Sequence, residues 1–120
     1  MNSYYFSVTK IKPDFAIMSS GFCSGSLAHK NYYDKTIEIP TLHIYGKTDQ
    51  IIPYEMSELL MESCENVTTL PHEGGHYFPA SAQLKQFYIS YFQDRLQEHL
   101  EKLELQNSDV HNTHIIEQSN

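Results

Sequence analysis

Short apolar runs that end in turn residues predict three β-strands along this chain. Residues 14–18 (DFAIM) run into a Ser-Ser-Gly turn, residues 39–45 (IPTLHIY) are closed by Gly46, and residues 66–70 (NVTTL) end at Pro71. Apolar runs of this length, bounded by glycine, proline and serine, are typical of buried strands. Residues 22–38 between the first two strands are polar and irregular, and they predict a long connection.

Two other segments carry the helical period. The first begins after Pro53 and places four side chains at the spacing of one apolar helix face: Met56, Leu59, Leu60 and Cys64. The second keeps the period for about five turns: Leu84, Phe87, Tyr88, Tyr91, Phe92, Leu96, Leu100 and Leu103. From Gln106 onward the periodicity fades, which predicts a loose polar tail.

The predicted order is strand, connection, strand, helix, strand, helix. Strands that alternate with helices imply parallel pairing and right-handed crossovers, hence an α/β fold. Three strands make a thin sheet, and parallel sheets need helices on both faces. We therefore expect residues 1–103 to be the C-terminal portion of a larger α/β domain, with residues 104–120 as a polar, disordered tail.

Composition and net charge narrow the range of functions that this chain can have. The chain has 120 residues, 40% of them hydrophobic, and a net charge of −7. An acidic balance argues against nucleic-acid binding, which needs clustered Lys and Arg. The last 28 residues hold six acidic and two basic side chains, so they carry −4 of the −7.

Targeting features are also informative. No apolar run approaches the roughly 20 residues of a membrane-spanning helix, and residues 1–10 have no apolar signal-peptide core. The two cysteines, Cys23 and Cys64, form no disulfide framework. We expect reduced thiols and a cytoplasmic location, with the nucleus as an alternative.

Two polar residues follow neighbouring strands and are candidates for catalysis. Asp49 comes just after the second strand, and His76 lies in a Gly-Gly loop after the third. In open α/β sheets, functional groups gather beyond the carboxyl ends of the strands. An aspartate there can orient a histidine that acts as general base. The chain order Asp then His is also that of an α/β-hydrolase triad.

Two other patterns compete with this interpretation. His72 and His76 fit the zinc motif H-E-x-x-H, but that motif needs both imidazoles on one helix face, and Gly74-Gly75 at its centre disfavours a helix. Cys23 sits in a G-x-C-x-G pattern after a strand, like a nucleophile elbow, yet the segment behind it is a poor helix. We expect the Cys23 thiol to be unreactive, and we expect His72 and His76 to bind no metal.

Three motifs resemble the FSH-type serine hydrolases, the family that includes the ovarian-cancer-associated esterase. They are Ser-Gly-Phe at 20–22, P-T-L-H-I-Y-G-K-T-D at 40–49 and G-G-H-Y-F-P at 74–79, and the resemblance covers about residues 12–95. It implies an α/β-hydrolase fold and a Ser-Asp-His triad that hydrolyses acyl esters without a cofactor. Position by position, Asp49 matches the triad aspartate and His76 the triad base. Cys23 matches no nucleophile.

The chain departs from this family in one respect, because it has no G-x-S-x-G motif for the nucleophile. We therefore expect the chain to be inactive alone, and to be a truncated product, a splice form or a partial gene model. An alternative is a non-catalytic interaction module that uses the acidic C-terminal helix around residues 93–105. A zinc hydrolase through His72 and His76 is a further alternative.

Overall fold

The computed structural model describes residues 11–119, with side chains as far as residue 110. The chain forms two compact units, Met1–Pro79 and Ala80–Asn120, which are described separately.

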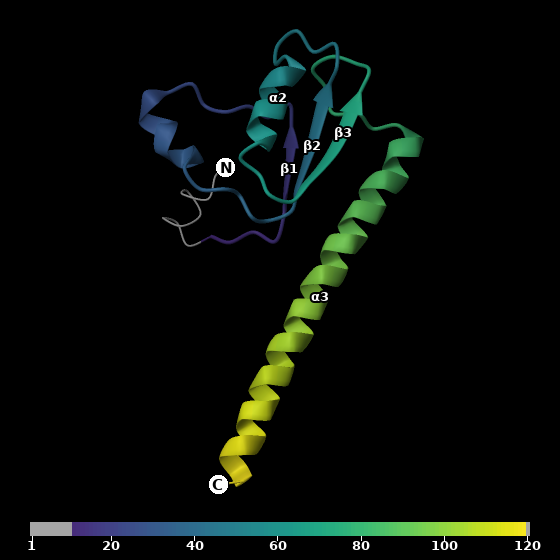
Figure 1. The fold of residues 1–120 in the computed structure, drawn as a ribbon. Coiled ribbons are helices and arrows are strands. Elements are labelled where there is room, and N and C mark those ends of the chain that lie inside the picture. Colours follow the sequence, from purple (N-terminus) through teal and green to yellow (C-terminus); the bar gives the residue numbers. More distant parts are fainter. Residues whose placement is uncertain (1–10, 120) are drawn as a thin grey trace. The chain divides into compact units, whose positions relative to one another are not determined.

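A three-stranded parallel sheet organises the first unit (Figure 1). Strands β1 (Ala16–Ser19), β2 (Thr41–Gly46) and β3 (Val67–His72) lie in the order β1-β2-β3. The registers align Ile17 with Leu42 and Leu42 with Thr68. Helix α2 (Tyr54–Met61) connects β2 to β3 and packs against β2. Strands thus alternate with helical connections, and the predicted α/β class is confirmed.

The core of this unit lies on β2, which has a neighbour on each side. Leu42 is fully buried and Ile44 is 1% exposed. The polar residues Thr41 and His43, which precede them in the strand, are equally inaccessible to solvent. His43 Nε2 lies 3.0 Å from Thr41 Oγ1, so the two buried polar side chains satisfy each other. Burial also lowers the pKa of His43, which keeps the ring neutral in the core.

Helix α2 buries a different face from the one predicted. Leu60 and Cys64 are buried as expected, but Leu59 is 55% exposed and Met56 is also exposed. Ser57 takes the inner position, where its hydroxyl donates a 2.8 Å hydrogen bond to the carbonyl of Gly21. The hydrogen bond from Ser57 to Gly21 therefore helps to determine which face of α2 is buried, and the spacing of hydrophobic residues does not predict this bond.

Two local features differ from the predicted connections. The segment 22–38 contains a 3₁₀ helix, η1 (Leu27–Tyr33). Its surroundings are held by polar contacts, such as the 2.7 Å pair between Ser24 Oγ and His29 Nδ1. Strand β3 continues through Pro71, which pairs with Tyr45. Proline is tolerated there because β3 is an edge strand of the sheet.

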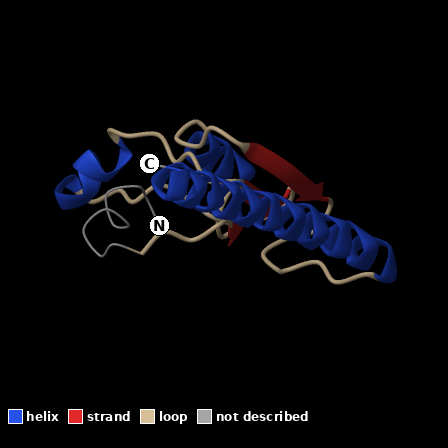
Figure 2. Cartoon of the chain, turned by 90° about the horizontal axis from the view of Figure 1, so that it is seen from below, coloured by secondary structure: helices blue, strands red, loops and turns tan. Residues whose placement is uncertain are grey.

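The second unit is one unbroken helix, α3 (Ala82–Ser119), drawn in blue in Figure 2. Ser81 caps its start, since the hydroxyl accepts a 3.3 Å hydrogen bond from the Leu84 amide. The helix passes residue 103 without a break and continues over 104–119, where we expected a loose tail. The domain boundary between 103 and 104 stays a prediction. Within the described residues, no helix combines the length and the apolar character needed to cross a membrane.

Candidate active site

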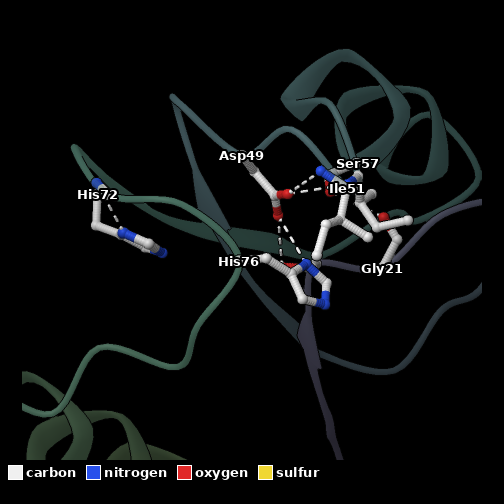
Figure 3. A network of polar contacts seen from close by, with 9 residues as sticks. Gly21, Asp49, Ile51, Ser57, His72 and His76 are labelled. Carbon is white, nitrogen blue, oxygen red and sulfur yellow. Dashed lines mark hydrogen bonds and ion pairs between the residues drawn. The ribbon is translucent and has the colours of Figure 1, made fainter.

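The carboxyl ends of β2 and β3 bring the two predicted catalytic residues together (Figure 3). Neighbouring parallel strands end at the same edge of a sheet, so residues that follow them become neighbours. Asp49 lies three residues beyond the end of β2, and His76 lies four residues beyond the end of β3. His76 Nδ1 is 2.9 Å from Asp49 Oδ2.

The Asp49 carboxylate is buried, with a side chain only 1% exposed, and it accepts four hydrogen bonds. Oδ1 accepts from the backbone amides of Ile51 and Ile52 at 2.8 and 2.9 Å. Oδ2 accepts from His76 Nδ1 and, at 3.3 Å, from the hydroxyl of Ser20. The donors therefore divide equally between the two oxygens and fix the carboxylate in one orientation.

These contacts determine the charge of Asp49. Burial on its own raises the pKa of the carboxyl group, but hydrogen bonds from Ile52, His76 and Ile51, with the charge of His76, outweigh it. The net result is a pKa lowered to about 2. Asp49 is therefore ionised at neutral pH and can only accept hydrogen bonds. Nδ1 of His76 must then carry the proton, which leaves the lone pair of the neutral ring on Nε2.

The loop that carries His76 is tied to the residues that follow β2. The amide of Lys47 donates to the carbonyl of His72 at 2.8 Å, and the amide of Thr48 donates to Gly74 at 3.2 Å. The Thr48 hydroxyl also donates to the carbonyl of Glu73 at 3.1 Å. An exposed ion pair joins the Lys47 and Glu73 side chains at 2.8 Å. The two strand ends thus form one hydrogen-bonded platform under the histidine.

Glycine at position 46 permits this close packing. A Cβ atom placed on Gly46 would collide with the carbonyl oxygens of Gly74 and Gly75. The Gly-Gly segment folds directly over the end of β2 as a result, and it delivers His76 to Asp49.

The outer nitrogen of His76 is available for chemistry. Its side chain is 43% exposed, and Nε2 points away from Asp49 (Figure 3). Among the described residues, Nε2 has no hydrogen-bond partner. An imidazole that is oriented by a buried carboxylate and open at Nε2 has the arrangement of a general base.

The alternative zinc arrangement does not form. His72 is the last residue of β3, and its Nδ1 accepts a 3.2 Å hydrogen bond from the amide of Gly74. Residues 72–76 are not helical, so His72 and His76 share no helix face. Over the described part of the chain, no three His, Cys, Asp or Glu side chains are grouped closely enough to hold a metal.

The cysteine elbow is likewise not formed. After β1, the chain reaches η1 only at Leu27, and no α-helix follows Cys23 directly. Burial, together with the nearby Cys64 and Glu62, raises the pKa of the Cys23 thiol. A thiol that stays protonated is a weak nucleophile. Cys23 lines a cavity of about 380 Å³ beside Leu59.

Three partners of Asp49 were not identified from the sequence. The amides of Ile51 and Ile52 are backbone groups without a side-chain signature, although an aspartate that binds amides two and three residues ahead is a common turn. Ser20 directly follows β1 and so lies at the same sheet edge. The strand-end rule that selects Asp49 and His76 also applies to this serine.

Comparison with known proteins identifies a family whose sequences are similar to this chain. The family described as "Serine hydrolase (FSH1)" matches residues 4–88. Esterase GA18864 of Drosophila pseudoobscura pseudoobscura is 61% identical over 101 residues, which are 84% of this chain and 35% of that protein. Esterase AGAP003155 of Anopheles gambiae is 51% identical over 110 residues, 92% and 41% of the two chains.

A more distant relative is Esterase OVCA2 of Homo sapiens, 35% identical over 80 residues, which are 66% of this chain and 35% of that protein. The chain thus spans about a third to two fifths of the length of the curated relatives it matches.

Proposed function

The chain belongs to the FSH1 family of serine hydrolases, as its motifs predicted, and on this premise we propose that Asp49 and His76 are the orienting carboxylate and the general base of a Ser-His-Asp triad that hydrolyses carboxylic esters. One observation carries the proposal. The buried, ionised Asp49 accepts a hydrogen bond from Nδ1–H of His76 at 2.9 Å, so that Nε2 is left free to take a proton. The relatives named as esterases support the reaction class.

The reaction would proceed by acyl transfer. Nε2 of His76 removes the hydroxyl proton of a serine as its oxygen attacks the ester carbonyl. The resulting imidazolium, stabilised by Asp49, then protonates the leaving alcohol and an acyl-serine remains. Water attacks this acyl-serine by the same steps in the second half of the cycle, which releases a carboxylic acid and restores the serine. The substrate class is a small acyl ester.

We assign the nucleophile to sequence outside these 120 residues, because they contain no G-x-S-x-G motif. The matched relatives support this assignment, since each is more than twice as long as the segment it shares with this chain.

A chimera tests the proposal. The 101-residue segment of Esterase CG5412 of Drosophila melanogaster, which is 60% identical, would be replaced by the matching segment of this chain. We expect the chimera to hydrolyse p-nitrophenyl butyrate. Asp49→Asn should lower kcat by about 10⁴-fold, because the wrong tautomer then faces the serine, and His76→Ala should abolish turnover. Asp34→Asn, an exposed acid beside η1, is the matched control and should keep full activity. A folded chimera whose activity survives His76→Ala would refute the assignment.

A further inference from the structure

Ser20 has an unusual backbone conformation at the edge of the candidate site. Its φ is +50°, and it is the one non-glycine residue of the described chain with a positive φ. This left-handed region costs conformational energy for any residue with a Cβ, so it persists only where surrounding contacts impose it. Glycine would adopt the same turn without that cost.

Contacts on both sides impose the conformation. The amide of Ser20 donates to the carbonyl of Ile44 at 2.8 Å, which continues the pairing of β1 with β2. The next carbonyl, that of Gly21, accepts the 2.8 Å hydrogen bond from Ser57 of α2. Gly21 also lies close to α2, since a Cβ added to it would be 2.9 Å from Leu60 Cδ2. The turn is held between the sheet and the helix, and this sets the direction of the Ser20 side chain.

The Ser20 hydroxyl then reaches the Asp49 carboxylate. Ser20 is 8% exposed, and its Oγ lies 3.3 Å from Oδ2, the oxygen that also accepts from His76. We propose that Ser20 is a positioning residue whose hydroxyl fixes Oδ2 of Asp49 for its hydrogen bond with His76 Nδ1. The inference rests on the proposed function, because positioning Asp49 matters for catalysis only if Asp49 and His76 belong to the proposed triad.

The division of donors explains why this hydroxyl matters. The amides of Ile51 and Ile52 hold only Oδ1, so they leave the carboxylate free to tilt about that oxygen. Without Ser20, the place of Oδ2 would depend on His76 alone, and His76 sits on a loop with 43% of its side chain exposed. Ser20 is not a nucleophile in this geometry, because its hydroxyl donates to the carboxylate on the Nδ1 side of the imidazole.

Three variants of the full chain separate positioning from stability. Ser20→Gly removes the hydroxyl and relieves the positive φ, whereas Ser20→Ala removes the hydroxyl and keeps the strained backbone. Ser57→Ala is the matched control, because it deletes another buried serine hydrogen bond next to the same turn without touching Asp49. Each variant would be examined by chemical denaturation and by ¹⁵N NMR of the His76 ring.

In the wild type we expect the Nδ1–H tautomer of His76. Both Ser20 variants should raise the exchange rate of the Nδ1 proton with water about three- to tenfold, the range expected for loss of one hydrogen bond. Ser20→Gly should do so without loss of stability. Ser57→Ala should lower stability and leave the ring signals unchanged.

Other results would overturn the inference. If neither Ser20 variant alters the ring signals, or only Ser20→Gly does, the hydroxyl does not position Asp49, while the triad assignment stands. If the wild-type ring lacks the Nδ1–H tautomer, both the Asp49–His76 pair and the positioning role fail. In the esterase chimera, the same variants should lower kcat about three- to tenfold and leave KM unchanged.

Discussion

Asp49 combines a buried position with a complete set of hydrogen-bond donors, and this combination explains how a single carboxylate can orient a surface histidine. A buried carboxylate without donors would become protonated and lose its value as an acceptor. The hydrogen bonds from Ile52, His76 and Ile51, with the charge of His76, outweigh that effect and lower the pKa of Asp49 to about 2. The negative charge of Asp49 is therefore maintained by the backbone amides of Ile51 and Ile52 as well as by His76.

This arrangement predicts a specific response to acid. The pKa of Asp49 falls from 3.8 to about 2 on folding, so above pH 3.8 its stabilising contribution is fully present. As the pH drops from 3.8 towards 2, the unfolded chain takes up the proton first and the contribution is lost. The free energy of unfolding of wild type minus that of Asp49→Asn, measured by urea denaturation, should be constant above about pH 4 and shrink below it.

Asp34→Asn is the control for this measurement, because Asp34 is an exposed acid and its removal tests the loss of one carboxylate as such. The interpretation fails if the gap between wild type and Asp49→Asn stays constant down to pH 2.

At this scale the sequence predicts the ionisable side chains of the site better than the backbone amides and the hydroxyl that contact them. Asp49 and His76 could be selected because each follows a recognisable strand and has side-chain chemistry suited to acid–base catalysis. The amides of Ile51 and Ile52 are backbone groups that any residue supplies. Ser20 also follows a predicted strand, but its contact with Asp49 depends on its positive φ, which does not follow from residue types.

Between elements, the site depends on how closely the loop after β3 approaches the end of β2. Gly46 is the contact point, since any side chain there would meet the carbonyls of Gly74 and Gly75. Those carbonyls belong to backbone, which cannot move aside as the end of a flexible side chain can. The position of His76 should therefore be unusually sensitive to a methyl group added at Gly46, although α2 and β3 separate the two residues in sequence.

Gly46→Ala tests this dependence. We expect a loss of stability of about 1–3 kcal/mol from overpacking, together with loss of the Nδ1–H signature of His76. Gly25→Ala is a matched control, because a Cβ at Gly25 meets no atom within 4 Å and its φ is not positive. That variant should be neutral or stabilised by up to about 1 kcal/mol. Denaturation and ¹⁵N NMR of His76 measure both effects, and equal behaviour of the two variants would contradict the steric argument.

The elements themselves were predicted to the extent that hydrophobic burial determines them. All three strands appear because short apolar runs with turn residues at their ends are the signature of a buried parallel sheet. The face of α2 was predicted wrongly because Ser57, a polar residue, is drawn inward by the Gly21 carbonyl. The 3₁₀ helix η1 escaped prediction because polar contacts such as Ser24 to His29 hold its surroundings, and these have no hydrophobic period.

On the scale of the whole molecule, the alternation of elements was enough to predict the α/β class, and the motifs were enough to predict the family. The net charge of −7 adds little about the reaction, because more than half of it lies in the last 28 residues, outside the loops that carry Asp49 and His76. In the proposed triad, this chain would supply the general base, His76, and the carboxylate that orients it, Asp49. A base without a nucleophile cannot transfer an acyl group.

The 120-residue chain should therefore show no serine-hydrolase activity by itself. We expect no turnover of p-nitrophenyl butyrate above the rate of the His76→Ala variant, and no covalent label from a fluorophosphonate, a reagent that marks activated serines. The esterase chimera is the positive control for both assays, and intact-mass spectrometry would locate any adduct. Any residual hydrolysis shared equally by wild type and His76→Ala would be background from the solvent or from contaminants. Turnover that disappears in His76→Ala, or a fluorophosphonate adduct on any serine of the chain, would instead show that these residues already hold a nucleophile within reach of Nε2.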